Sequence, residues 1–209
     1  MTSSLPHLAG RDLHLWRGDR ALFSGLGFEA AAGSCVQVTG PNGSGKTSLL
    51  RALCGLLPWE QGSVHWRNRE VGADRYAFHA ELAYLGHDTG LKSDLTAVEN
   101  LYYEVGLRRA VDRDMAAAVL ARVGVERVMH QDVRQMSAGQ KRRVAFARVL
   151  LSACPLWVLD EPTSNLDAAG QELVGVLLDE HLAAGGIAVV ATHHALPLRA
   201  GTLQSLELG

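Results

Sequence analysis

The feature that most constrains this chain is the stretch at residues 40–47, which reads Gly-Pro-Asn-Gly-Ser-Gly-Lys-Thr. It matches the phosphate-loop pattern G-x-x-x-x-G-K-[ST], and it stands between an apolar run at residues 35–39 and a helical pattern of leucines. Glycines let successive backbone N–H groups surround a phosphate, and the helix N-terminus behind them favours negative charge. The sequence therefore predicts a nucleotide-phosphate site rather than an ordinary Gly-rich turn.

Two side chains of this stretch have expected roles of their own. The Lys46 ammonium is expected to reach the β- and γ-phosphates and to act in catalysis, and the Thr47 hydroxyl is expected to bind Mg²⁺. The nucleotide-binding residues predicted here are Gly40, Pro41, Asn42, Gly43, Ser44, Gly45, Lys46, Thr47 and Ser48.

Composition limits the partners of such a site. The chain has 209 residues, which suits a single domain over residues 1–209, and its net charge of −2 gives no reason to expect a nucleic-acid partner. The three cysteines are scattered through apolar stretches, so we expect buried thiols in a reducing compartment. The N-terminus carries no signal-type apolar segment and no run of about 18 apolar residues occurs, so we expect neither secretion nor a membrane span.

Apolar periodicity predicts strands that alternate with helices. The expected strands are residues 8–16, which read as an edge strand ending at Trp16, and residues 35–39, 62–67, 82–86, 155–160, 187–191 and 202–208. The expected helices follow the phosphate loop, Thr96 (with Glu99 completing a capping box), Asp112, Gly139 and Leu173. Residues 68–80 read as irregular and residues 88–136 as a helical insertion. This alternation is typical of an α/β fold with a parallel sheet.

A pair of acids follows one of the most apolar strands. Residues 156–159 are apolar, and Asp160 and Glu161 come directly after them. A carboxylate at the end of a buried strand beside the phosphate loop can hold Mg²⁺, and this role is assigned to Asp160. Glu161 is expected to act as the general base that polarises the attacking water. A purely structural role does not explain why a charge, which is costly to bury, adjoins a core run.

Three weaker signals lie elsewhere. Ser137, Gly139 and Gln140 stand at the start of a helix, where free N–H groups form a second anion site, although serine is also a common N-cap. Trp16 is either a core or boundary aromatic or a residue that stacks on a nucleobase, and spacing does not decide between the two. The basic block at residues 141–143 has a local function or forms a solvated face.

Taken together, residues 40–47, 137–140, 156–161, 164–167 and 192–193 resemble the ATPase domain of ABC transporters, in the same order and over nearly the whole chain. The resemblance implies a P-loop NTPase with a mostly parallel core sheet, an antiparallel edge β-subdomain and a helical insertion. ATP and Mg²⁺ are the cofactors that it implies.

The resemblance also implies roles for single residues. Trp16 matches the base-stacking aromatic, and His193 matches the histidine that contacts the γ-phosphate. Ser137, Gly139 and Gln140 match the family signature, in which Ala138 replaces the usual first glycine. His87 replaces a glutamine that contacts water or Mg²⁺. Because imidazole can still make one such contact and titrates near neutral pH, we expect pH-sensitive turnover.

Members of this family work as head-to-tail pairs. The resemblance places ATP between the phosphate loop of one copy and the Ser137–Gly139 helix end of the other, and residues 164–167 match the loop that crosses the interface. Because this chain has one phosphate loop and one signature, the expected pair is a homodimer.

A closer resemblance, carried by residues 87–92, 95–101, 135–145 and 153–162, is to the haem-exporter ATPases of cytochrome c maturation. It implies a peripheral subunit on the cytoplasmic face of the inner membrane that drives haem-handling integral membrane partners and releases a haem-loaded chaperone. The insertion is the expected docking face, unless its apolar residues only close its own core; these are Leu91, Leu95, Tyr102 and Tyr103. No direct haem binding is expected, because the nine histidines show no haem-type spacing.

Other functions remain open from the sequence. The chain could serve another small-solute ABC transporter, or it could be a non-transport ABC ATPase that acts on DNA or ribosomes. The second is disfavoured because the sequence shows no second ATPase half, no long coiled-coil insertion and no basic stripe. A GTPase or kinase is disfavoured because no Asn-Lys-x-Asp guanine-binding motif occurs.

Overall fold

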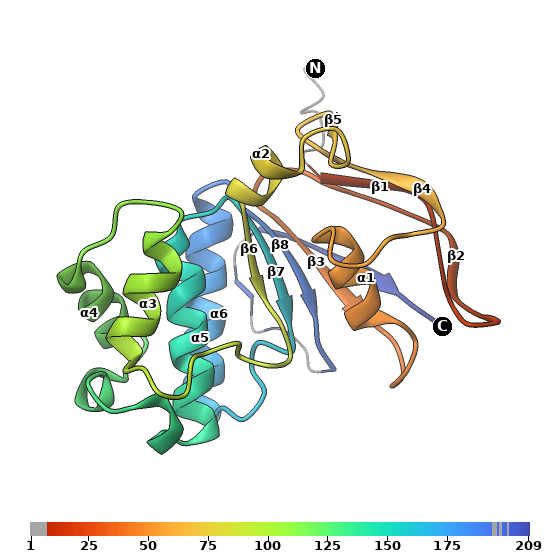
Figure 1. Ribbon diagram of the computed structural model, residues 1–209. Coiled ribbons are helices and arrows are strands. Elements are labelled where there is room, and N and C mark those ends of the chain that lie inside the picture. The colour runs from red at the N-terminus through yellow and green to blue at the C-terminus, as the bar shows by residue number, and fades with distance from the viewer. Residues whose placement is uncertain (1–7, 194–195, 197, 200) are drawn as a thin grey trace.

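A five-stranded parallel sheet forms the centre of the fold (Figure 1) in the computed structural model, which describes residues 8–193, 196, 198–199 and 201–209. Its strand order is β6-β7-β8-β3-β9, and every neighbouring pair is parallel. The strands are β6 (Leu82–Leu85), β7 (Leu156–Asp160), β8 (Ile187–Ala191), β3 (Ser34–Thr39) and β9 (Thr202–Glu207). Every residue of β7 and β8 is buried, because both faces of the sheet are covered and continuous apolar runs suit such strands.

A second, antiparallel sheet lies with α1 (Lys46–Leu53) on one side of the parallel sheet. Its strands, in spatial order, are β2 (Arg20–Ala30), β1 (Leu8–Arg17), β4 (Gln61–Trp66) and β5 (Arg69–Glu70). Leu50 of α1 is buried in one cluster with Phe23 of this sheet and Val158 of the parallel sheet. The helix that begins at the phosphate loop is therefore held by both sheets.

Helices cover the opposite face of the parallel sheet. The helices α5 (Ala138–Ser152) and α6 (Ala168–Ala183) lie along it, and α3 (Ala97–Gly106) and α4 (Arg113–Arg122) lie outside α5 (Figure 1). Two 3-10 turns, η1 (Glu126–Val128) and η2 (Val133–Gln135), precede α5. Leu101, Leu120 and Phe146, one from each of α3, α4 and α5, belong to one buried cluster with Trp157 of β7. The capping box of Thr96 and Glu99 begins α3, as predicted.

Four predictions about the elements need correction. β1 is not an edge strand, because it pairs with β2 on one side and β4 on the other. Residues 68–80 contain β5 and also α2 (Arg75–Ala80), a six-residue helix whose N-cap is Asp74. The helix after the phosphate loop ends at Leu53, so Leu56 lies outside it and is 61% exposed. Finally, α6 begins at Ala168 rather than Leu173, because Asp167 caps it.

The three cysteines are buried free thiols, as predicted. Burial raises the pKa of Cys35 to about 12 and also raises the pKa of Cys54, so these thiols stay protonated and act as small core residues. No helix within the described residues is long and apolar enough to span a membrane.

Candidate nucleotide site

The phosphate loop connects the end of β3 to the start of α1. Gly40, Gly43 and Gly45 have φ angles of 140°, 83° and 103°, in the region that favours glycine. Packing adds a second requirement at Gly40, where a Cβ atom would lie 2.2 Å from the carbonyl oxygen of Leu208. The buried Ser44 Oγ has no hydrogen-bond partner among the described residues, so the loop offers a hydroxyl that a phosphate oxygen would satisfy.

Lys46 folds back over this loop. Its Nζ donates hydrogen bonds to the carbonyl oxygens of Gly40 at 2.7 Å and Pro41 at 3.0 Å. The residue is buried, so solvent screens its charge little. Because an ammonium has three N–H donors, one remains for a phosphate oxygen after these two carbonyls.

Thr47 and Asp160 meet beside the loop. Thr47 Oγ1 donates a hydrogen bond to Asp160 Oδ2 at 2.8 Å. Asp160 is the last residue of β7 and is buried, so the sheet fixes its position. A hydroxyl and a carboxylate oxygen side by side are ligands that suit Mg²⁺, which takes its other ligands from phosphates and water. The two oxygen donors therefore fit that arrangement.

Glu161 follows in an unusual backbone conformation. Its φ angle is 49°, in the left-handed region that residues with a Cβ atom rarely occupy. Its Oε1 lies 3.4 Å from Nε2 of His193, which is within ion-pair range when the imidazole is protonated. That buried oxygen nevertheless has no well-formed hydrogen bond in the described chain. A partly buried carboxylate with an uncommitted oxygen is suited to accept a proton from water.

Most of the predicted site residues line one cavity of about 540 Å³, whereas Gly40, Pro41 and Ser44 of the phosphate loop do not line it. Its lining residues are Arg17, Leu22, Asn42, Gly43, Gly45, Lys46, Thr47, Ser48, His87, Asp160, Glu161, Ser164 and His193. The cavity therefore joins the phosphate loop, the end of β7, and the loops that follow β6 and β8. His87 and His193, predicted from distant parts of the chain, are brought to the same place.

The hairpin of β1 and β2 supplies two lining residues that sequence reasoning missed. Arg17 and Leu22 line the cavity, and a Cβ atom on Gly45 would lie 3.1 Å from Leu22 Cβ. The sequence feature that could have indicated Arg17 is its position directly after Trp16, the candidate base-stacking aromatic. Trp16 itself is not among the lining residues, and it is 48% exposed, which excludes a core position but leaves open both a boundary position and stacking on a nucleobase.

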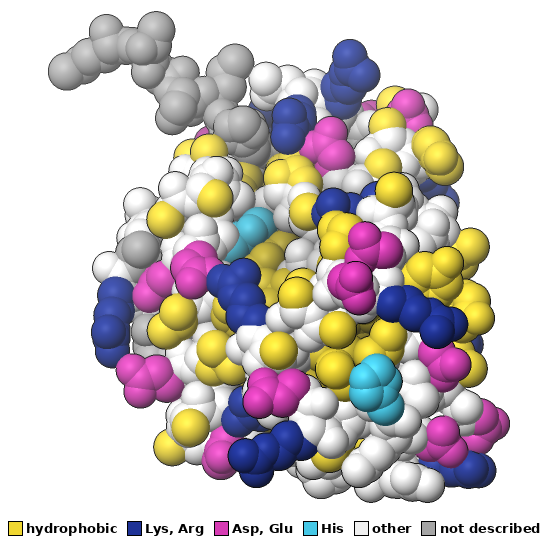
Figure 2. Space-filling model, turned by 90° about the vertical axis from the view of Figure 1, so that its left-hand side faces the viewer, with side chains coloured by type: hydrophobic (Ala, Val, Ile, Leu, Met, Phe, Trp, Pro, Cys, Tyr) yellow, Lys and Arg dark blue, Asp and Glu magenta, His cyan; other side chains and the backbone are white. Residues whose placement is uncertain are grey.

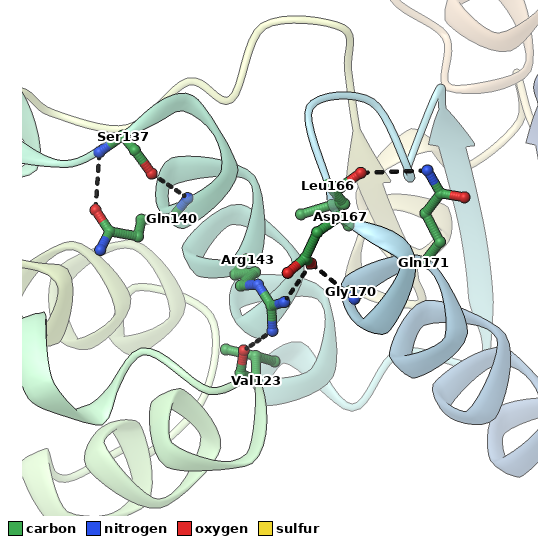
Figure 3. Close-up of polar contacts among 8 residues, drawn as sticks. All are labelled: Val123, Ser137, Gln140, Arg143, Leu166, Asp167, Gly170 and Gln171. Atoms are coloured by element: carbon green, nitrogen blue, oxygen red, sulfur yellow. Dashed lines mark hydrogen bonds and ion pairs between the residues drawn. The ribbon is translucent and has the colours of Figure 1, made fainter.

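The predicted second anion site lies apart from this cavity, since no residue of 137–140 lines it. Ser137 caps α5: its Oγ accepts from the Gln140 N–H at 3.2 Å, and Gln140 Oε1 accepts from the Ser137 N–H at 2.8 Å (Figure 3). At Gly139 a Cβ atom would lie 2.8 Å from the carbonyl oxygen of Asn165. The start of α5 is therefore a well-capped helix end that packs against residues 164–167 and leaves Ser137 exposed.

Arg143 ties α5 to two other segments (Figure 3). Its Nη1 donates to the carbonyl of Val123 at 2.9 Å, and its Nη2 donates to Asp167 Oδ1 at 3.0 Å. Asp167 also accepts from the Gly170 N–H at 2.9 Å as the N-cap of α6. This backbone hydrogen bond and the Arg143 guanidinium hold the pKa of Asp167 below its usual value. One side chain thus links the end of α4 and the start of α6 to α5.

Comparison with known proteins identifies the arrangement. Residues 23–164, more than half of the chain, match the family model described as ABC transporter. The chain belongs to the ABC transporter family. It is an ABC-type ATPase, so the predicted fold class and enzyme class are confirmed.

Two curated relatives match this ABC ATPase over nearly their whole length. The cytochrome c biogenesis ATP-binding export protein CcmA 2 of Cupriavidus metallidurans is 46% identical over 94% of this chain and 93% of its own. The corresponding protein CcmA of Methylococcus capsulatus is 46% identical over 96% of this chain and 97% of its own. These matches confirm the closer of the two resemblances.

Solved structures share the fold of the ABC ATPase. The dimeric structure of MJ0796, a bacterial ABC transporter cassette, has a TM-score of 0.85 at 24% identity and covers 97% of this chain and 95% of its own. A putative ABC transporter ATP-binding protein from Pyrococcus furiosus has a TM-score of 0.82 at 22% identity, with 95% and 96% covered. At these identities the comparison establishes the fold.

Proposed function

We propose that this ABC ATPase powers the export step of cytochrome c biogenesis, in which it drives haem-handling membrane subunits that release a haem-loaded chaperone. The 46% identity to two export proteins of cytochrome c biogenesis supports this role. The observation that best supports ATP hydrolysis is that Lys46, the Thr47–Asp160 pair and Glu161 line the same cavity.

In this proposal the residues in and near the cavity bind different parts of ATP. The backbone N–H groups of residues 40–48 and the Lys46 ammonium bind the phosphates, and Trp16 stacks on the base. Thr47, Asp160 and His87 would hold Mg²⁺, which would neutralise negative charge on the phosphates.

Glu161 and His193 act on the reacting atoms. Glu161 accepts a proton from the attacking water through the oxygen that has no hydrogen bond. His193, whose Nε2 lies 3.4 Å from Glu161 Oε1, donates a hydrogen bond to the γ-phosphate.

Two copies form the working unit in this proposal. The exposed Ser137 end of α5 does not line its own nucleotide cavity, and the solved MJ0796 cassette of the same fold is dimeric. In a head-to-tail homodimer this helix end of one copy closes the γ-phosphate side of the other copy's cavity. Its N–H groups and the Ser137 hydroxyl then supply donors to the phosphate.

The proposed docking site for the membrane subunits is a groove of about 510 Å³ between the parallel sheet and α3. Leu56 and Leu107 line it and are 61% and 89% exposed. The proposal rests on the placement of two exposed leucines at the same groove. On the predicted docking face Tyr103 is 52% exposed, whereas Leu91 packs against the buried core. Figure 2, which looks onto the helical side, shows hydrophobic side chains among charges of both signs. The subunit would thus sit peripherally on the cytoplasmic face of the inner membrane.

Complementation tests the proposed function. The gene is expressed in a bacterium whose homologous ATPase gene has been deleted, and c-type cytochromes are quantified by haem staining. Wild type restores them, while Lys46→Ala and Glu161→Gln do not, because phosphate binding or proton transfer is lost. Arg122→Lys, on the half-exposed ion pair with Glu180, is the control and restores them as wild type does.

Leu107→Asp separates docking from catalysis. We expect the purified variant to hydrolyse ATP at the wild-type rate but to lose co-purification with the membrane subunits and to fail in complementation. Restoration of cytochromes by Lys46→Ala would contradict the proposed function. Loss of general solute uptake with normal cytochromes would assign the chain to another small-solute transporter.

A further inference from the structure

The strongest unassigned feature is the buried guanidinium of Arg142 in α5. The residue is 1% exposed, although it lies in the basic block at residues 141–143 for which a solvated face was one of two interpretations. Its side chain points into the protein and meets the two loops that flank the nucleotide cavity. Its hydrogen-bond partners among the described residues are all backbone carbonyl oxygens, namely those of Gly86, His87, Asp160, Glu161 and Pro162.

The number of acceptors matches the number of donors. Nη1 donates to Gly86 at 2.8 Å and to His87 at 3.2 Å, Nε donates to Pro162 at 3.3 Å, and Nη2 donates to Asp160 and Glu161. A guanidinium has five N–H donors in a fixed plane, so each one has an acceptor. No other side chain can satisfy five converging carbonyls from one position.

Burial of this charge has a cost that packing alone does not explain. Desolvation lowers the pKa of Arg142, while the charges of Asp160 and Glu161 oppose that shift. Whole buried ion pairs can often be replaced by apolar side chains without loss of stability, but the removal of one buried partner leaves the other groups unpaired. The carbonyls that Arg142 binds, rather than its fit in the core, account for a cation at this site.

The segment that Arg142 holds is the one under backbone strain. Glu161 has a φ angle of 49°, and Arg142 binds the carbonyls of Asp160, Glu161 and Pro162 in succession. A strained conformation persists only where the surroundings over-determine it. The same guanidinium also fixes the backbone of His87, which lines the opposite side of the cavity.

We propose that Arg142 is a positioning residue for ATP hydrolysis: it fixes the backbone of Glu161 and His87 so that their side chains face the reacting γ-phosphate. It touches neither nucleotide nor water itself. The inference rests on the proposed role of Glu161 as general base. It adds that the Arg142 guanidinium sets the distance between Glu161 and the attacking water.

The test compares Arg142→Lys and Arg142→Gln with wild type, with Arg122→Gln as the matched loss of a cation at a half-exposed site. Lysine keeps the charge but gathers its three donors on one nitrogen, and so cannot reach both loops. Because small displacements of a catalytic group are costly, we expect kcat to fall about 10- to 100-fold. The KM for ATP and the affinity for Mg·ADP should change less than about threefold, because the phosphate loop is untouched.

Each outcome decides a different point. A folded Arg142→Lys with wild-type kcat would overturn the inference, as would an equal loss of Mg·ADP affinity, which would indicate general damage to the site. If the Lys variant does not fold, Arg142→Gln carries the same test, and failure of both to fold would assign Arg142 to stability alone. Glu161→Gln is measured in parallel: if it retains turnover, the proposed function fails, whereas turnover lost there but kept in Arg142→Lys refutes only this inference.

Discussion

At the scale of single residues, the site depends on two oxygens that are far apart in the chain. Thr47 starts α1 and Asp160 ends β7, and their side chains meet at 2.8 Å. The sheet and the helix hold them before any ligand arrives, so little ordering is left for binding. In the proposed function, this arrangement would let the hydroxyl and the carboxylate serve together as ligands of one Mg²⁺ ion.

Thr47→Val should weaken the Mg²⁺ dependence of ATP turnover. Valine keeps the shape but removes the hydroxyl, so the apparent Mg²⁺ affinity is expected to fall about tenfold, equivalent to ~1.4 kcal/mol. Titration of steady-state ATPase activity with MgCl₂ measures this shift. Thr47→Ser retains the hydroxyl and is the control. An unchanged Mg²⁺ titration in Thr47→Val would show that the hydroxyl is not a ligand.

Sequence reasoning found some residues of the site and not others, for physical reasons. Lys46, Thr47 and Asp160 belong to local patterns whose chemistry is visible in the chain, and His193 was assigned only by resemblance to a family. Arg142 looked like part of a surface charge run. Its burial follows from a tertiary approach of two loops that no local pattern records.

At the scale of elements, the start of α5 combines a good helix cap with a close contact. Ser137 and Gln140 cap each other, and the backbone at Gly139 approaches the carbonyl of Asn165. A capping box stabilises a helix wherever it stands. The close approach, by contrast, requires a residue with no side chain.

Gly139→Ala should therefore destabilise the protein even though alanine favours helices. A Cβ atom 2.8 Å from the Asn165 oxygen must displace it, and overpacking of this kind costs about 1–3 kcal/mol against a gain in helix propensity of up to about 1 kcal/mol. Denaturant unfolding measures the net change. Gly106→Ala, in α3 with no atom within 4 Å of the added Cβ, is the matched control and should stabilise. A Gly139→Ala variant as stable as Gly106→Ala would contradict the close contact.

The Arg143–Asp167 link predicts a pH-dependent contribution to stability. Because the pKa of Asp167 is lowered in the folded protein, its ionised form stabilises the fold above its ordinary value of 3.8, and this stabilisation is lost as the pH falls through the lower, folded value. Asp167→Asn should lower Tm at pH 7, and the difference should shrink below about pH 4. Asp19→Asn, in the turn between β1 and β2, is the control. A difference in Tm that does not vary with pH would exclude the ionic contribution.

The elements were predicted where burial leaves a strong pattern. β7 and β8 are buried throughout, so their apolar runs were visible, and the caps of α3 and α4 were visible as side chains. β2 is not among the strands expected from the sequence, because most of its residues face solvent and leave no clear apolar pattern. The helix α2 buries only Phe78, so no periodicity marked it.

At the scale of the whole molecule, the nucleotide cavity of one chain is incomplete in the proposed dimer without the other chain. The phosphate loop, Asp160 and Glu161 face one side, while the capped end of α5 lies elsewhere on the same chain. ATP would therefore contribute directly to the contact between two copies.

Glu161→Gln should trap this dimer. With hydrolysis blocked and the phosphate contacts intact, Mg·ATP is expected to double the mass measured by light scattering, whereas Mg·ADP leaves it unchanged. Adding Lys46→Ala to Glu161→Gln should abolish the increase, because the phosphates are no longer held. A Glu161→Gln protein that stays monomeric with ATP, alone and in the assembled complex, would contradict the dimer.

The contact between Gly139 and Asn165, together with the Arg143 bridge to Asp167, has a consequence for timing. Ser164, in the same loop, lines the chain's own cavity, while Ser137 would reach across to the neighbour's. The start of α5 and residues 164–167 would therefore form one connected unit that contacts both nucleotide cavities of the proposed dimer. Release of product from one nucleotide site would therefore shift the other site, so that hydrolysis of the two ATP molecules would be coupled rather than independent.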